Sequence, residues 1–279
     1  MPALVVPFTK MHGAGNDFVV LDNRFFHFSA AELADLARRV CPRRFGVGAD
    51  GLLALSPPRE DGHDYRMDYL NADGTRAGMC GNGARCLARF ARSAGLTAEP
   101  LTFGSDAGTY RAAVPADPAA PVRLFVPPPE RYREAVPTEG ADEPAYIWTG
   151  TDHAVLFVPA AEAAPVGEAG PRLRRDPAFQ PAGANVDFVE VLNPDPARLR
   201  VRTFEKGVEA ETLACGTGAL AAALVARLAG RVRGEAVAVE MPGGTLRVGF
   251  RLGGDGAAGV RDLWLEGPAE VVYQGTLEV

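Results

Sequence analysis

The stretch MCGNGARC (residues 79–86) is the strongest indication of the fold, because its core recurs as ACGTGA (residues 214–219). Each copy places a cysteine before two glycines that flank one polar residue, and an apolar run follows. Such runs predict helices, so we expect Cys80 and Cys215 each at a helix N-terminus. Exposed N–H groups and the positive end of the helix dipole favour a thiolate there and bind anions. Two such positions in one chain indicate a functional pair.

A structural interpretation of each copy is also open. Cysteine is often a small buried hydrophobe, and a lone Gly-x-Gly-Ala segment can serve close packing, so short motifs by themselves mislead. We expect Cys41, beside Pro42, and Cys86, inside the helix, to be ordinary core residues. The recurrence of the motif is what favours a functional interpretation of the other two cysteines.

One offset of 135 positions relates the two halves of the chain. The pairs related in this way are Cys80 and Cys215, Gly15 and Gly150, Gly48 and Gly183, Ala49 and Ala184, and Asn71 and Lys206. The same offset places the predicted strand 65–70 over 200–205. We therefore expect two similarly folded halves that face each other across a cleft, with the proline-rich segment 115–144 as the boundary.

Other elements are predicted from local signals. Ser29 is a predicted N-cap, with Glu32 three residues later, for a helix over 30–40. A strand over 4–8 is expected to lead into a glycine-rich turn over 10–17, and a strand over 18–22 follows. The last strand, from Glu270 onward, could complete either half.

Composition restricts the class of protein. The chain has 279 residues, 47% of them hydrophobic, and a formal net charge of -6. That charge argues against a nucleic-acid or anionic-membrane surface, and the apolar run 219–228 is too short to span a bilayer. No leader segment is recognisable, so we expect a cytoplasmic protein with reduced cysteines. The spacing of the four cysteines does not predict a zinc site.

A cysteine from each half suits one kind of chemistry. If one is a thiolate and the other a thiol, a carbon acid held between them can lose a proton on one face and gain one on the other. The developing negative charge on a substrate carboxylate needs strong stabilisation, and converging helix N-termini can supply it. His153 could polarise the nearby cysteine, although it could equally be a satisfied semi-buried histidine. Asn16, Asn71 and Asn185 could merely satisfy their own turns.

The chain resembles the diaminopimelate epimerase family along nearly its whole length. The matching segments are KMHGAGNDFVVLD (10–22), FGVGADGLL (45–53), NADGTRAGMCGNGARC (71–86), GANVDFV (183–189), FEKGVEAETLACGTGA (204–219) and MPGG (241–244). The resemblance implies an α+β fold of two pseudo-symmetric halves, each wrapping strands around a central helix, with the active site in the cleft between them. The expected halves are 1–129 with 268–279, and 130–267.

The resemblance also implies an activity. Members interconvert LL- and meso-diaminopimelate, in lysine and peptidoglycan synthesis, without pyridoxal phosphate or a metal, and they are typically homodimers. Cys80 and Cys215 would be the acid–base pair, and His153 and Glu205 would tune them. Backbone groups of the first helical turns would hold the reacting carboxylate, at Gly81, Asn82, Gly216 and Thr217. The rest of the substrate would contact Asn16, Asn71, Thr151, Asn185, Glu205 and Lys206.

Three positions depart from the family pattern, all where the far end of the substrate would bind. Gly51 replaces a glutamine found in many members, Thr151 replaces an asparagine, and Lys206 replaces an arginine. Lysine offers a point charge where arginine offers a bidentate clamp. Two alternatives therefore stay open: a related cofactor-independent racemase or epimerase for another amino acid, and a non-catalytic ligand-binding or redox-sensing protein with a cysteine pair.

Overall fold

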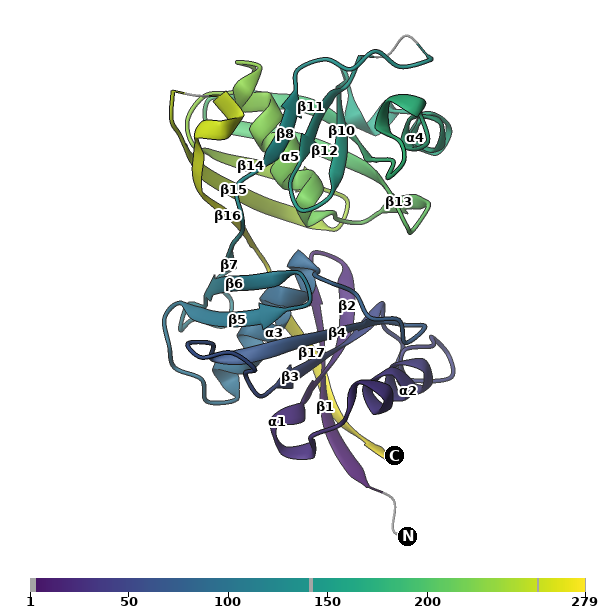
Figure 1. Ribbon diagram of the computed structural model, residues 1–279, viewed down its shortest axis with the longest axis vertical. Coiled ribbons are helices and arrows are strands. Elements are labelled where there is room, and N and C mark those ends of the chain that lie inside the picture. The colour runs from purple at the N-terminus through teal and green to yellow at the C-terminus, as the bar shows by residue number, and fades with distance from the viewer. Residues whose placement is uncertain (1–3, 141–142, 255, 279) are drawn as a thin grey trace. The chain divides into compact units, whose positions relative to one another are not determined.

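The computed structural model describes residues 4–140, 143–254 and 256–278. The chain divides into two compact units: unit 1 comprises the chain up to Phe125 and from Glu266 onward, and unit 2 is the continuous segment Val126–Leu265. Both units combine strands with a few helices (Figure 1). The α+β class predicted from the sequence is confirmed.

The strands of unit 1 form a mixed β-sheet. Its hydrogen-bonded order is β17, β1, β2, β3, β4, β5, β6, β7, with parallel pairs at β2/β3 and β4/β5 and antiparallel pairs elsewhere. The C-terminal strand thus completes this unit by pairing with β1. The strands are β1 (Val5–Gly13), β2 (Asn16–Asp22), β3 (Gly51–Ser56), β4 (Tyr65–Asn71), β5 (Leu101–Ser105), β6 (Gly108–Ala113), β7 (Val122–Phe125) and β17 (Glu270–Glu278).

The helix α3 (Gly81–Ser93) is the core of unit 1. Nine of its residues are buried, and it packs against β1, β2, β3, β4 and β7. The short α1 (Asn23–Phe26) and the amphipathic α2 (Ala30–Val40) lie outside the strands that surround α3 (Figure 1). The predicted capping box of α2 is present, because Ser29 and Glu32 exchange side-chain and backbone hydrogen bonds.

Unit 2 has the same plan around α5 (Gly216–Leu228), which again buries nine residues. Hydrogen bonds join β8, β9, β10, β11, β12, β14 and β15 in that order, with parallel pairs at β10/β11 and β12/β14. No described helix has the length and hydropathy that crossing a membrane requires. The other elements are β8 (Glu130–Arg133), β9 (Ala145–Trp148), β10 (Asp152–Phe157), β11 (Asn185–Pro194), β12 (Ala197–Glu205), β13 (Ala210–Thr212), β14 (Ala236–Met241), β15 (Gly244–Leu252), β16 (Val260–Gly267), α4 (Val166–Arg174), η1 (Ala161–Ala163), η2 (Pro177–Phe179) and η3 (Gly256–Gly259).

Strand registers correct the single offset between the halves. Phe18 on β2 pairs with Gly51 on β3, whereas His153 on β10 pairs with Asn185 on β11. The first members of these pairs are 135 positions apart, but the second members are 134 apart. The loop that leads into β11 is therefore one residue shorter than the loop that leads into β3. Loops absorb such changes, because a one-residue slip within a strand would turn every side chain to the wrong face.

The shortened loop also changes which residues are equivalent before the cysteines. Leu52 pairs with Leu70 in unit 1, and Val186 pairs with Phe204 in unit 2. Asn71 is thus the equivalent of Glu205, and its predicted equivalence with Lys206 is wrong. One extra residue before Cys215 then restores the offset of 135.

The glycine-rich turn predicted over 10–17 is much shorter than expected. The strand β1 runs through Gly13, and β2 begins at Asn16. Only Ala14 and Gly15 form the turn, with φ of 53° and 96°. Two consecutive residues with positive φ are typical of a tight β-hairpin, whose twist matches that of its strands. Lys10 and Asp17 therefore lie on strands.

Candidate active site

Cys80 and Cys215 are the N-cap residues of the two buried helices. Both have extended backbone angles, with φ and ψ of -136° and 118° at Cys80 and -117° and 110° at Cys215. The Cys80 sulfur accepts the Gly83 N–H at 3.5 Å, and the Cys215 sulfur accepts the Gly218 N–H at 3.4 Å. Donors of the first helical turn have no partner within the helix, so each sulfur lies where a negative charge is favoured.

A chain of side-chain hydrogen bonds surrounds the first turn of α3. The Asn82 amide donates to Asn16 Oδ1 at 2.6 Å, and the Asn16 amide donates to Asp50 Oδ2 at 3.1 Å. Arg85 donates to Asn82 Oδ1 at 2.6 Å. Asn16 thus links β2 to both the helix and the loop before β3, which is more than satisfying its own turn. Asn71, in contrast, donates to Thr75 Oγ1 at 3.0 Å within its own turn.

Asp17 anchors an ionic cluster at the start of β2. Arg43 binds it through two bonds of 2.7 and 3.0 Å, and Lys10 Nζ lies 2.7 Å from Oδ2. Burial pulls the Asp17 pKa upward, but the hydrogen bonds and charges of Arg43 and Lys10 outweigh this effect and lower the pKa to about 2. Arg43 also binds Asp50 at 2.9 Å, which joins the cluster to Asn16.

The depressed pKa of Asp17 predicts an acid-labile contribution to stability. Since the folded-state pKa lies below the ordinary value of 3.8, the contribution is present above about pH 4 and is lost as the pH falls toward 2. We expect Asp17→Asn to lower the urea midpoint of unfolding at pH 7 and to make little difference at pH 2. Urea titrations of both proteins at pH 7, 4 and 2 test this. A gap that stays constant with pH would contradict it.

In unit 2 a buried triad lies beneath the first turn of α5. His153 Nδ1 lies 2.7 Å from Asp187 Oδ2, and both side chains have 0% exposure. Thr203 donates to the other Asp187 oxygen at 2.7 Å. A Cβ added at Gly218 would lie 2.6 Å from Asp187 Oδ1, so the helix contacts the carboxylate directly. A polar side chain buried this deeply needs such hydrogen-bond partners.

Asn185 and Lys206 are held together at the ends of β11 and β12. Asn185 Oδ1 accepts the Lys206 N–H at 2.7 Å, and the Asn185 amide lies 3.4 Å from His153 Nε2. The Lys206 ammonium binds Asp152 Oδ2 at 3.1 Å and the Gly183 carbonyl at 3.3 Å. Lys10 makes the equivalent contacts to Asp17 and Gly48 in unit 1. Lys206 is therefore tied to a carboxylate of its own unit.

The remaining candidate residues of unit 2 lie close to Cys215 or to the helix start. Thr217 Oγ1 is 3.4 Å from the Cys215 sulfur, and Glu205 accepts a hydrogen bond from Thr212 at 2.9 Å. Burial, followed by the charges of Glu205 and Asp187, raises the pKa of the Cys215 thiol, and the Thr217 hydroxyl and the Gly218 N–H offset only part of this. Thr151 lies in the turn between β9 and β10, where Thr149 donates to the Thr217 carbonyl at 2.9 Å.

Comparison with known proteins decides the family. The sequence model described as "Diaminopimelate epimerase" matches residues 8–124 and 145–256. The diaminopimelate epimerase of Chlorobaculum tepidum is 41% identical over 270 residues, covering 96% of this chain and 99% of that protein. That of Aquifex aeolicus is 37% identical and covers 97% of each chain. The chain belongs to the diaminopimelate epimerase family.

Solved structures show how widely this fold is used. A phenazine biosynthesis protein of the PhzF family from Bacillus anthracis has a TM-score of 0.73 at 14% identity, covering 99% of this chain and 100% of that one. A hydroxyproline epimerase from Agrobacterium vitis has a TM-score of 0.68 at 18% identity, covering 99% and 92%. At these identities the likeness establishes the fold alone.

Two of the departures from the diaminopimelate epimerase pattern have a local structural basis. A Cβ added at Gly51 would lie 2.5 Å from the Leu70 carbonyl oxygen, so this backbone does not accommodate a glutamine there. Lys206 forms an ion pair with Asp152, the residue next to the substituted Thr151. Asp152 also accepts a hydrogen bond from the Tyr146 hydroxyl at 2.6 Å. Burial acts against ionisation of Asp152, but the bonds from Tyr146 and Lys206 lower its pKa overall. The changes at Thr151 and Lys206 thus adjoin one ionic contact.

Sequence reasoning missed three buried polar residues of this family member: Arg85, Asp187 and Thr203. All three have 0% exposure. Asp187 stands alone in the apolar run NVDFV, and Arg85 occupies a buried position of α3. A charged residue at a core position is the signal that could have found Arg85 and Asp187, because such residues are rarely buried without partners; the uncharged Thr203 gives no such signal.

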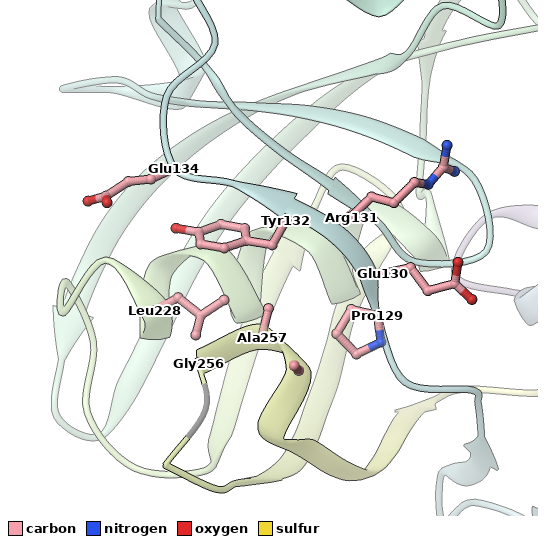
Figure 2. A pocket seen from close by; sticks show the side chains of 9 residues that line it. Pro129, Glu130, Arg131, Tyr132, Glu134, Leu228, Gly256 and Ala257 are labelled. Carbon is pink, nitrogen blue, oxygen red and sulfur yellow. The ribbon is translucent and has the colours of Figure 1, made fainter.

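A separate pocket of about 630 Å³ lies elsewhere in unit 2 (Figure 2). Leu228 at the last turn of α5 contributes to it, so it lies at the opposite end of that helix from Cys215. Among the described residues, its lining is Pro129, Glu130, Arg131, Tyr132, Glu134, Leu228, Gly256, Ala257 and Ala258. The described residues also contain no group of three His, Cys, Asp or Glu side chains placed to hold a metal ion.

Proposed function

We propose that this protein interconverts LL- and meso-diaminopimelate by proton transfer at Cα between Cys80 and Cys215. One observation carries the proposal: in a member of this family, each of two topologically matching units presents a cysteine at the N-cap of its buried helix. One cysteine removes the α-proton as a thiolate, and the other donates its proton to the opposite face. This chemistry needs neither pyridoxal phosphate nor a metal.

The first helical turns would stabilise the reacting carboxylate. Removing the α-proton places enolate-like charge on its oxygens, and backbone donors at helix N-termini are suited to that charge. The donors proposed for this role are the N–H groups of Gly81, Asn82, Gly216 and Thr217. The cysteine pair requires that substrate is held between the two halves, which we place at 1–129 with 268–279 and at 130–267. Exclusion of water from that space would strengthen these interactions.

The other candidate residues would orient the substrate and tune the cysteines. His153 and Glu205 are proposed to adjust the acidity of Cys215, and the charge of Glu205 already contributes there. Asn16, held between Asn82 and Asp50, and Asn185, held by Lys206, present preorganised amides. The proposed substrate contacts are Asn16, Asn71, Thr151, Asn185, Glu205 and Lys206. Ammonium and carboxylate groups of a diamino-dicarboxylate substrate match this mixture of amides, carboxylate and cation.

We also propose a cytoplasmic homodimer that acts in lysine and peptidoglycan synthesis. Active thiols favour a reducing compartment. The strand β17 exposes three consecutive apolar residues, Val271, Val272 and Tyr273. A run of exposed large apolar side chains supports an interaction surface at this strand, and a second copy of the chain is the partner proposed for it. Sedimentation at several concentrations tests the dimer.

Exchange at Cα tests the proposed function directly. In deuterium oxide, we expect the protein to replace the α-hydrogen of LL-diaminopimelate with deuterium while it forms the meso isomer, as followed by proton NMR. A panel of other amino acids, including proline, lysine and glutamate, serves as the control for specificity. If diaminopimelate is inert while another amino acid exchanges and inverts, the substrate assignment is wrong and the epimerase chemistry remains.

A further inference from the structure

The two cysteines have the same backbone environment. Each is an N-cap with extended backbone angles, each helix has 13 residues, and each sulfur accepts the N–H three residues later at 3.4–3.5 Å. The helix dipole therefore acts almost equally on both. Any difference in acidity between the cysteines must arise from their burial, since Cys215 is buried and Cys80 is half-buried, and from the side chains around them.

Those side chains differ sharply at equivalent positions. A Cβ added at Gly83 in α3 would meet Leu53 at 3.3 Å and Phe18 at 3.4 Å. At the equivalent Gly218 in α5 it would meet Asp187 and Thr203 instead. The strand registers agree, because Leu53 and Asp187 each lie two residues beyond the partners of Phe18 and His153. An apolar cluster in unit 1 is thus replaced by a carboxylate and its partners in unit 2.

The helix of unit 1 carries the opposite charge. Arg85, on α3, has 0% exposure, and Leu220 is the equivalent residue on α5. Its guanidinium donates to Asn82 Oδ1 at 2.6 Å and to the carbonyls of Gly81 at 3.3 Å and Pro268 at 3.4 Å. No carboxylate of the described residues forms an ion pair with it. This buried cation therefore lies against the residue that follows Cys80 and is not neutralised by an acid.

Nearby ionisable groups do not cancel this cation. Burial raises the pKa of the adjacent Cys86 thiol to about 12, so it stays uncharged. Burial lowers the pKa of Arg85, and a thiolate at a neighbouring cysteine such as Cys80 would act in the opposite direction. Several other charged groups on the strands around α3 are paired with opposite charges: His12 with Glu270, Asp17 with Lys10 and Arg43, and Asp68 with Arg66 and Arg76. Beside α5, Asp152 is paired with Lys206, whereas the charge of Glu205, like that of Asp187, raises the pKa of Cys215.

We propose that the resting enzyme carries its thiolate on Cys80, stabilised by the buried Arg85 cation, and its thiol on Cys215, beside the Asp187 carboxylate. The proposal rests on the proposed function, because it presumes that the two cysteines exchange one proton. In the first half-cycle Cys80 takes the α-proton and Cys215 gives its own proton to the other face. The substrate is inverted, and the enzyme is left with a Cys80 thiol and a Cys215 thiolate. Arg85 and Asp187 are positioning residues in this scheme.

Alkylation of the substrate-free protein tests this assignment. The rate of carboxamidomethylation by iodoacetamide is measured separately at Cys80 and Cys215, by peptide mass spectrometry, from pH 5 to 10. The midpoint of each pH profile is used, because absolute rates also reflect accessibility. We expect the Cys80 midpoint to lie below the ordinary value of about 8.5 and below that of Cys215. Each profile is repeated with the partner cysteine replaced by alanine, since thiols that share a proton titrate jointly.

Variants separate the charge from a structural role. Arg85→Leu copies the residue found in unit 2 and should raise the Cys80 midpoint by about one pH unit, with the rate at pH 7 falling about tenfold. Arg85→Lys should keep the midpoint low. Asp187→Asn should lower the Cys215 midpoint and leave that of Cys80 unchanged. If Arg85→Leu fails to fold, this variant still tests whether the neighbouring charges set the difference in acidity between the two cysteines.

A Cys80 midpoint at or above that of Cys215, or one that is unmoved by Arg85→Leu, overturns the assignment. The measurement needs no substrate, so its outcome is independent of whether diaminopimelate is turned over. Loss of the proposed function with an intact difference in midpoints would refute only the function.

Discussion

Cys80→Ala and Cys215→Ala will each abolish inversion of diaminopimelate and leave proton exchange on one face of Cα. A positioned general acid or base typically contributes about 10²–10⁴-fold to the rate. Each variant keeps one base and lacks the group that protonates the opposite face. We therefore expect kcat/KM for epimerisation to fall by at least about 10³-fold in both variants.

The residual exchange distinguishes the two variants. Cys80 and Cys215 face opposite sides of the substrate carbon in the proposed mechanism, so each isolated cysteine reaches the α-hydrogen of only one configuration. Proton NMR in deuterium oxide should show that one variant exchanges the L centre and the other the D centre, without interconversion.

Cys41→Ala is the matched control for both cysteine variants. Cys41 is buried in the cluster between α2 and the sheet of unit 1, and burial raises its pKa to about 12. Its replacement should leave kcat within about twofold of the wild type. Full inversion by either active-site variant would refute the two-base mechanism.

Gly218→Ala should have the next largest effect on stability and activity, because the added methyl group would clash with the buried triad of unit 2. The added Cβ would lie 2.6 Å from Asp187 Oδ1 and 3.1 Å from Thr203 Oγ1. Asp187 is fixed between Thr203 and His153 and cannot yield without losing one of its bonds. Overpacking of this kind costs about 1–3 kcal/mol, against about 0.5–1 kcal/mol that alanine gains in a helix. We expect net destabilisation and, because the turn also holds Cys215, a kcat about 10–100-fold lower.

Gly83→Ala is the matched substitution in unit 1. Its Cβ would meet apolar atoms of Leu53 and Phe18 at 3.3–3.4 Å, and these side chains need to move by only a few tenths of an ångström. The change in unfolding free energy should stay within about 1 kcal/mol. Urea unfolding and steady-state kinetics of both variants make the comparison. Equal effects of the two substitutions would show that the carboxylate beneath Gly218 is not what constrains that turn.

The sequence predicted the plan of this protein because its strongest signals are local and repeated. The motif at Cys80 and its copy at Cys215 combine a helix start, glycines that allow close packing and an apolar run, and all three depend on neighbouring residues. The helix over 30–40 was predicted from Ser29 and Glu32 for the same reason, and the structure confirms its bounds. The α+β class and the membership of the epimerase family were also within reach of these motifs.

The details that escaped prediction depend on contacts between distant segments. Glycine matches suggested one offset throughout, but only hydrogen bonds between strands show that the loop into β11 lacks a residue. The partnership of Lys206 with Asp152 joins residues 54 positions apart. The helical pattern could have marked Arg85 as buried, but it does not reveal that Arg85 binds the Pro268 carbonyl, because that contact spans 183 positions. The site roles assigned by resemblance remain predictions.

The return of β17 to β1 has a consequence for the order in which the protein is made. Synthesis completes all of unit 2, the continuous segment Val126–Leu265, before the strand that closes unit 1 has emerged from the ribosome. Until then β1 lacks the partner that pairs with Val5–His12, and an unpaired strand edge is prone to wrong association. During that interval the second unit is able to fold while the first is still open. The strand that follows unit 2 in the chain is the one that lets the half containing Cys80 close.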